Sequence, residues 1–173
     1  FVGCLLRFSE SLNCFRQLLA EIGSLHSVRI ECKDYLPDWR PNRQIKESYS
    51  ARSGEGGVLL DLIHEIDYAG WVFGWPVEVQ ARLVNRGRLG IEADELAAVM
   101  WETKDESIVT MELDYLTRPA RRRARASGEN GTIEWNGIDG TVSIALAGKT
   151  VRVERFDDSQ ESMMLAQDSA FLQ

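Results

Sequence analysis

The sequence predicts an α+β domain: one large, mainly antiparallel, open β-sheet with helices packed on one face. Two segments have helical spacing of their apolar residues, and strand-like segments fill most of the second half of the chain. Tight polar turns join most of these strands, which favours antiparallel pairing because parallel strands need long crossovers. With 173 residues and 44% hydrophobic content, the chain can bury one substantial core.

The beginning of the chain predicts a strand, a helix and a second strand. Residues 2–8 form a short apolar run that is typical of a buried strand. Residues 10–22 have apolar side chains at helical spacing, with Ser9 or Ser11 as the N-cap. Residues 27–32 alternate as expected for a strand with one solvent-exposed face.

The rest of the chain predicts two further helices and a run of strands. Residues 58–73 form a helix that is apolar on nearly all sides, and residues 159–172 form a terminal helix. The strand-like segments between these helices are residues 77–84, 94–103, 107–116, 121–126, 132–136, 142–145 and 150–156.

Composition excludes several classes of partner. The 27 acidic and 20 basic residues give a net charge of −7, which argues against nucleic acids and anionic membranes. No apolar run approaches the roughly 20 residues that cross a bilayer. The sequence contains no basic-then-apolar leader pattern, so we do not expect this chain to be marked for export. Cys4, Cys14 and Cys32 lack CxxC spacing, so we expect reduced thiols in a cytoplasmic protein rather than disulfides or a zinc site.

The apolar helix over residues 58–73 carries an unusual set of ionisable side chains: Asp61, His64, Glu65 and Asp67. At about 100° per residue, Asp61, His64 and Asp67 fall within one 120° arc. A carboxylate one turn from an imidazole is the arrangement that a general base requires. A structural histidine satisfied by neighbouring acids is the alternative. A metal site is less favoured, because the other histidine lies in a different element.

The irregular segment of residues 34–57 is the second candidate site. Loops longer than about 12–15 residues are uncommon unless they bind a ligand or are disordered. Trp39, Arg40, Arg43 and Tyr49 supply stacking surfaces and hydrogen-bonding forks that suit polyhydroxylated or anionic ligands. The alternative is a loop pinned by its own aromatic residues, with solvated arginines.

An arginine-rich run near residue 121 invites a nucleic-acid interpretation. On a strand, Arg121, Arg123 and Arg125 share one face, and we expect them opposite a strand that bears Glu112 and Asp114. Cross-strand ion pairs or a solvent-exposed sheet face are therefore the favoured interpretations.

Two further features concern what this chain lacks. Gly54, Gly56 and Gly57 precede a helix but do not form G-x-G-x-x-G after a strand, so no nucleotide site is expected here. The chain begins at Phe1, without Met, inside a strand-like run, and stops in a helical pattern. We therefore expect a piece of a longer protein.

The order of several motifs resembles one enzyme family. Gly56-Gly57, Asp61, the H-E-I-D sequence from His64 to Asp67 and a W-x-x-G at Trp71 are similar to the C-terminal domain of the glucose–fructose oxidoreductase, inositol dehydrogenase and rhizopine-catabolism (Gfo/Idh/MocA) family. Leu6-Arg7-Phe8 and its following helix resemble that domain's opening. Residues 126–133 resemble its late hairpin, where G-x-x-G-x-(I/L) recurs.

The resemblance implies the substrate-binding half of a two-domain oxidoreductase. An N-terminal Rossmann domain would bind NAD or NADP, and residues 1–173 would form a single substrate-binding and oligomerisation domain. The expected substrate is a sugar, polyol or related carbohydrate, and the expected assembly is a homodimer or tetramer through the sheet face. This chain alone would hold neither cofactor nor metal and would be inactive. A stand-alone carbohydrate-binding or dimerisation module is the alternative.

The resemblance also implies roles for particular residues. His64 would be the acid/base at the reacting hydroxyl, and Asp61 its partner. Asp67 and the aromatic and arginine residues of the long loop would contact the substrate. The commoner family spacing has four positions between this Asp and His, whereas His64 follows Asp61 by three. The partner of His64 is therefore left open between Asp61, Glu65 and Asp67.

Overall fold

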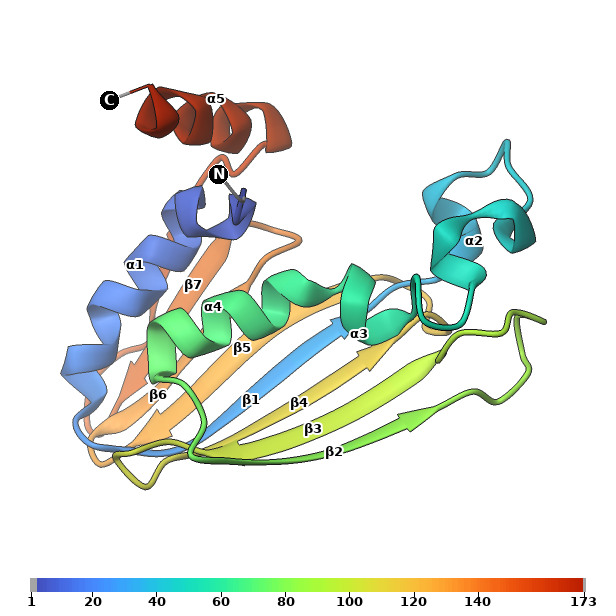
Figure 1. Ribbon diagram of the computed structural model, residues 1–173. Helices are drawn as coiled ribbons and strands as arrows, with labels where there is room; N and C mark the ends of the chain where they lie inside the picture. The colour runs from blue at the N-terminus through green and yellow to red at the C-terminus, as the bar shows by residue number, and fades with distance from the viewer. Residues whose placement is uncertain (1–2, 173) are drawn as a thin grey trace.

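Alternating apolar and polar side chains build one eight-stranded sheet in the computed structural model, which describes residues 3–172 (Figure 1). The strand order is β2-β3-β4-β1-β5-β6-β7-β8, and only the β1–β4 pair is parallel. The strands are β1 (Leu25–Lys33), β2 (Glu78–Val84), β3 (Leu96–Glu102), β4 (Ile108–Asp114), β5 (Arg121–Gly128), β6 (Gly131–Asn136), β7 (Thr141–Leu146) and β8 (Arg152–Arg155). The predicted fold class is confirmed.

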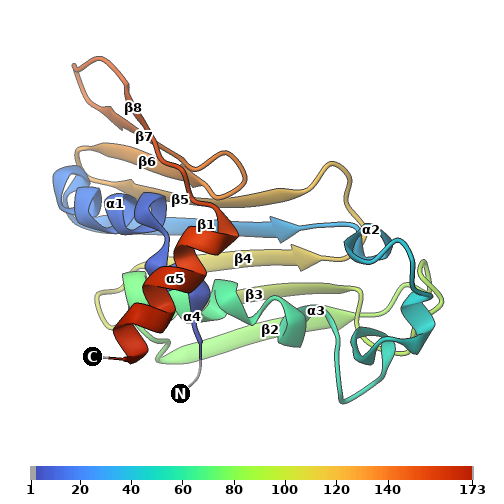
Figure 2. The same cartoon turned by 90° about the horizontal axis from the view of Figure 1, so that it is seen from above.

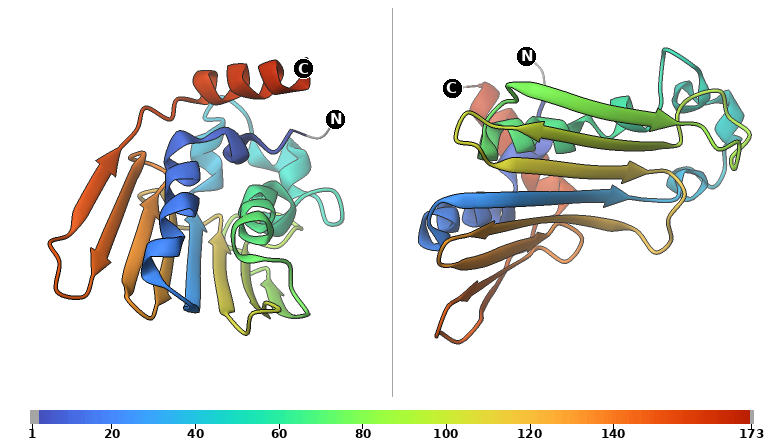
Figure 3. Two further views of the ribbon diagram at one scale, coloured as in Figure 1. Left: turned by 90° about the vertical axis from the view of Figure 1, so that its left-hand side faces the viewer. Right: turned by 90° about the horizontal axis from the view of Figure 1, so that it is seen from below.

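The helices gather on one face of this sheet, and the opposite face is open (Figures 2 and 3). The α-helices are α1 (Glu10–Leu18), α2 (Leu36–Trp39), α3 (Val58–Asp61), α4 (Ile63–Phe73) and α5 (Gln160–Phe171). Short 3₁₀ turns cover Leu5–Phe8, Leu19–Ile22, Ile45–Glu47 and Tyr49–Ala51. No helix among residues 3–172 is long and apolar enough to cross a membrane.

Helix α1 begins where the sequence predicts, at an N-cap serine. The Ser9 side chain accepts a hydrogen bond from the backbone N–H of Leu12, at 2.9 Å. Leu12 and Phe15 are fully buried against the sheet. The Trp135 indole on β6 donates a 2.6 Å hydrogen bond to the hydroxyl of Ser11. This bond ties the helix to the strand.

The predicted first strand is wrong. Leu5–Phe8 is a 3₁₀ turn, closed by a hydrogen bond from the backbone N–H of Arg7 to the carbonyl of Cys4; Val2 lies outside the described residues. The apolar side chains are covered by α4 and α5 rather than by a neighbouring strand. A short apolar run does not distinguish these two kinds of burial, because it is too short to show a period.

The predicted pairing of the arginine-rich strand with the Glu112 strand is also wrong. Strand β1 lies between β4 and β5, so Glu112 instead contacts Arg29 and Lys33 on β1. From the arginine run, Arg123 lies 3.9 Å from Glu134 on β6. The misplacement has a topological cause: β1 comes from far earlier in the chain and inserts between the two later hairpins.

Candidate functional site

The predicted helix over residues 58–73 is broken at Leu62. Its backbone angles of φ −94° and ψ 32° end α3 at Asp61 and start α4 at Ile63. Asp61 and His64 therefore lie on two different helical segments. The expected common 120° arc does not include Asp61.

Asp61 is held by a buried tyrosine rather than by His64. The Tyr115 hydroxyl donates a 2.7 Å hydrogen bond to an Asp61 carboxylate oxygen. Burial and this bond raise the pKa of Tyr115, so the phenol stays neutral and acts as the donor. The Trp39 ring packs edge-on against Tyr115, with 5.6 Å between the ring centroids. Asp61 is thus held in place by the residue that follows β4, and Trp39 of the long loop packs against that residue.

The other two carboxylates considered as partners of His64, Glu65 and Asp67, contact arginines instead. Asp67 accepts two hydrogen bonds from Arg7, at 2.9 and 2.7 Å, and this bidentate contact lowers the pKa of Asp67. Glu65 is fully buried and lies 2.8 Å from the Nε atom of Arg122. The His64 side chain is half-buried and makes no hydrogen bond to residues 3–172. Its charge nevertheless contributes to lowering the pKa of Asp67, which lies one turn further along the helix.

A cavity of about 440 Å³ opens beside Asp61. The end of β1, the start of β5, α2 and α3 meet here at one end of the sheet (Figure 1). Its lining combines carboxylates, cations, a thiol and an indole: Cys32, Lys33, Asp34, Trp39, Asp61, Leu62, Ala120, Arg121, Arg122 and Ile138. Mixed donors and acceptors beside an aromatic wall suit a polyhydroxylated ligand. His64 follows Asp61 by three residues, on the next helical segment, and lies outside this lining.

The long loop contains a second cavity, of about 260 Å³. Trp39, Arg40 and Arg43 line it together with apolar and polar loop residues. Trp39 therefore separates the loop cavity from the cavity at Asp61. Tyr49 lines neither cavity and has 48% of its surface exposed. Three of the four loop residues proposed from the sequence thus come together, and the fourth does not.

The glycines before α3 do not fit the pyrophosphate of NAD. Gly57 adopts φ +112°, and a Cβ there would lie 2.5 Å from the Asp94 carboxylate. The backbone N–H of Leu59 donates to that carboxylate at 3.3 Å, and the N–H of Val58 donates to the Asp94 carbonyl at 3.1 Å. An acidic side chain already occupies this helix terminus, so it would repel a phosphate.

The sequence interpretation missed Arg122 and Cys32, which line the main cavity. The signal was present: if Arg121, Arg123 and Arg125 share one strand face, Arg122 points to the other. That other face is the one covered by helices, and Arg122 is paired in register with Cys32 on β1. An arginine on the face covered by helices needs a negatively charged partner there, because an unpaired buried charge is costly.

Comparison with known proteins shows the family. The model of the GFO/IDH/MocA C-terminal domain matches residues 15–134, and this chain belongs to that family. A search of curated proteins found no significant match.

The solved structures with similar folds include dehydrogenases and a dehydrogenase homolog. A levoglucosan dehydrogenase in complex with NADH and levoglucosan has a TM-score of 0.80 at 16% identity, covering 97% of this chain and 55% of its own. An inositol dehydrogenase homolog from Azotobacter vinelandii with NAD+ has a TM-score of 0.76 at 12% identity, covering 89% and 43%. UDP-N-acetylglucosamine 3-dehydrogenase from Acidithiobacillus ferrooxidans has a TM-score of 0.72 at 19% identity, covering 98% and 50%. The chain spans about half the length of these structures.

Proposed function

We propose that this chain is the substrate-binding half of an NAD(P)-dependent oxidoreductase that acts on a hydroxyl of a sugar, polyol or related carbohydrate. The observation that carries the proposal is the cavity in which Asp61, Arg122 and Trp39 converge, with His64 near the start of the adjoining helix α4. Family membership supports it, as do the sugar and polyol dehydrogenases among the similar structures.

In this proposal the residues of the chain handle the substrate and its proton. A substrate hydroxyl in the cavity donates to the Asp61 carboxylate, which Tyr115 holds in place. The imidazole of His64 takes the proton of the reacting hydroxyl as the carbon that bears this hydroxyl is oxidised. NAD(P) supplies the hydride acceptor, and a separate nucleotide-binding domain would hold it, because the glycines before α3 do not. The 173-residue chain alone is expected to be inactive.

The test is turnover of the full-length protein that contains this domain. Replacing His64 with Asn should lower kcat by about 10²–10⁴-fold while the fold is retained, because general acid–base catalysis contributes that much. His26→Asn is a matched control, since His26 is exposed on β1. Near-normal turnover of the His64 variant would remove this residue from the mechanism.

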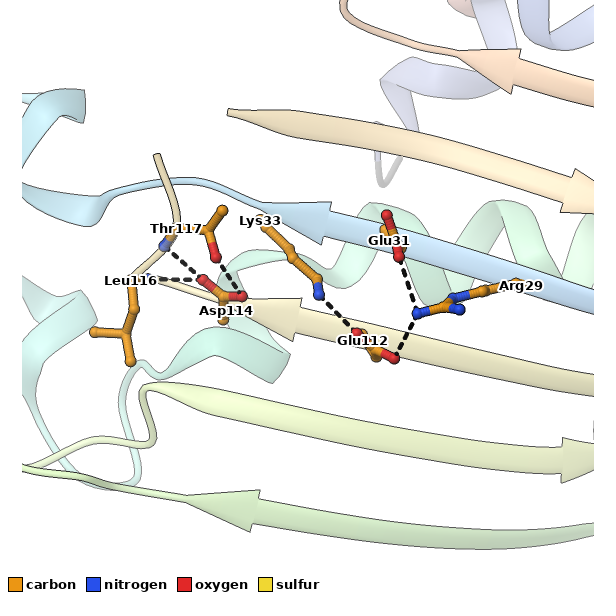
Figure 4. Close-up of polar contacts among 7 residues, drawn as sticks. All are labelled: Arg29, Glu31, Lys33, Glu112, Asp114, Leu116 and Thr117. Carbon is orange, nitrogen blue, oxygen red and sulfur yellow. Dashed lines mark hydrogen bonds and ion pairs between the residues drawn. The ribbon is translucent and has the colours of Figure 1, made fainter. Parts of the chain in front are cut away.

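The open sheet face supports the accompanying proposal of a homo-oligomer. Charged side chains of both signs line this face, and Glu112 bridges Arg29 and Lys33 at 3.0 and 2.6 Å (Figure 4). Opposite charges on one face allow a two-fold copy to pair with itself. Light scattering should show a dimer or tetramer, and Glu112→Lys, which adds like charge beside Arg29 and Lys33, should shift the mass toward the monomer. A strict monomer at high concentration would contradict the sheet-face assembly.

A further inference from the structure

One of the residues that line the main cavity, Arg122, belongs to an ion pair with a buried glutamate. Glu65 on α4 points at the sheet, and none of its surface is exposed. Arg122 on β5 has 27% of its side chain exposed, and its Nε atom lies 2.8 Å from a Glu65 oxygen. The contact is a close ion pair but too oblique for a hydrogen bond. Burying two such charges is costly, and well-packed apolar residues would often be at least as stable there.

The ion pair leaves hydrogen-bond donors of Arg122 unused. A guanidinium carries five N–H donors, and the closest contact with Glu65 is made by the Nε atom. The two Nη groups make no hydrogen bond to an oxygen of residues 3–172, and they are not among the polar atoms sealed from solvent. Arg122 is also a lining residue of the 440 Å³ cavity. The paired terminal nitrogens are therefore available to a ligand there.

The other charged groups of the cavity do not compete for these donors. Asp61 accepts from Tyr115, and Asp34 accepts from the backbone N–H of Tyr35 at 2.8 Å. Lys33 is drawn toward Glu112 on the open face. Burial and the charge of Glu65 raise the pKa of Cys32 to about 12, so its thiol is uncharged at neutral pH. Arg121 also lines the cavity but is exposed, so Arg122 is the mostly buried cation whose donors have no oxygen partner among residues 3–172 beyond the contact with Glu65.

We propose that Arg122 binds an anionic oxygen group of the substrate, a carboxylate or a phosphate, in the cavity that it shares with Asp61. A guanidinium presents two parallel N–H donors that match both groups in a bidentate contact. Glu65 acts as a positioning residue, because it fixes the guanidinium against the sheet. This inference rests on the proposed function, and it narrows the substrate class to acidic or phosphorylated sugars and polyols.

The test compares three related ligands on the whole chain. D-glucitol is the neutral parent, D-gluconate replaces one end with a carboxylate, and D-glucitol 6-phosphate carries a phosphate at the other. Binding is measured by calorimetry and by the fluorescence of Trp39, which lines the cavity. At least one anion should bind about 10- to 100-fold more tightly than D-glucitol, as expected for hydrogen bonds to a charged group. The anion that gains affinity identifies the group.

Two variants test whether Arg122 carries this preference. Glu65→Gln combined with Arg122→Gln removes both charges and avoids a buried unpaired carboxylate, and Arg122→Lys keeps the charge but loses the fork. Both should reduce the preference for the anion, the double variant abolishing it. Arg125→Gln is the matched control, because Arg125 is exposed on the same strand. Circular dichroism confirms that each variant is folded.

The outcomes separate this inference from the proposed function. Equal binding of all three ligands by the wild type would overturn the anion site and leave a polyol site standing. An anion preference that survives in the double variant would assign it to another residue and overturn the role of Arg122. If none of the three binds, the anion site is also overturned, whereas the dehydrogenase function is decided by turnover of the His64 variant.

Discussion

The two faces of the sheet both carry a glutamate paired with a cation, in opposite surroundings. Under the helices, Glu65 is fully buried against Arg122, whose side chain is 27% exposed. On the open face, Glu112 is 46% exposed between Arg29, at 59%, and Lys33, at 19%. Water can solvate either partner of the open-face pair when the other is removed. Under the helices it cannot reach Glu65, so removing Arg122 would leave a buried carboxylate unsolvated, and similar side chains have different energetic consequences.

The same contrast governs protonation. On the open face, the hydrogen bond from Lys33 is the largest cause and lowers the pKa of Glu112, and burial, the next largest, opposes it. Under the helices, burial is the largest single cause and lowers the pKa of Arg122, but the interactions with Glu65, Cys32 and Tyr68 together outweigh it, so the net pKa is raised.

The largest effect should come from breaking the buried pair. Arg122→Ala leaves the Glu65 carboxylate without a counter-charge, so we expect a loss of about 3–5 kcal/mol in the free energy of unfolding. Urea denaturation measures this loss. Arg125→Ala removes an exposed arginine three residues further along β5 and should change stability by about 0.5 kcal/mol or less. Equal losses in the two variants would mean that burial of the Glu65 pair has no energetic weight.

An intermediate effect should come from a neutral hydrogen bond under the helices. Ser11→Ala leaves the buried indole N–H of Trp135 without its acceptor and removes a donor to Asp158. The expected loss is about 1–3 kcal/mol, the usual cost of an unsatisfied buried group. Thermal unfolding of this variant is compared with Ser143→Ala on β7, which should be nearly neutral. A neutral Ser11 variant would show that water reaches Trp135.

The smallest effect should come from the open face. Glu112→Gln should cost about 0.2–1 kcal/mol at low ionic strength, because the group is nearly half exposed, and less in high salt. The lowered pKa of Glu112 means that its contribution is present above the unfolded-state pKa of about 4.3 and is lost as the pH falls through the folded-state pKa. Urea midpoints of the wild type and variant should therefore converge below about pH 4. A constant difference down to pH 2 would contradict an ionic origin.

The sequence pattern predicted most helices and strands, because each of them is marked by residues that lie close together in the chain. The period of two in β3 and β4 gave both strands within two residues at each end. The N-cap of α1 depends on Ser9 and a backbone group three residues away, so it was readable too. The turn at Leu5–Phe8 failed, since its burial comes from helices elsewhere in the chain.

The candidate site was predicted less completely, for a physical reason. The sequence placed His64 and Asp61 near one another through their spacing, and the loop residues through their type. The break at Leu62 and the bond from Tyr115, 54 positions away, then gave Asp61 a different partner.

By itself the sequence determined the fold class, the eight strands and a family resemblance, because periodicity, caps and turns act over a few residues. Tertiary structure alone decided that β1 inserts between β4 and β5, and that Arg122 meets Glu65 beneath a cavity. Each of these contacts joins residues far apart in the chain. Their free energy depends on burial that exists only after the helices have packed on the sheet.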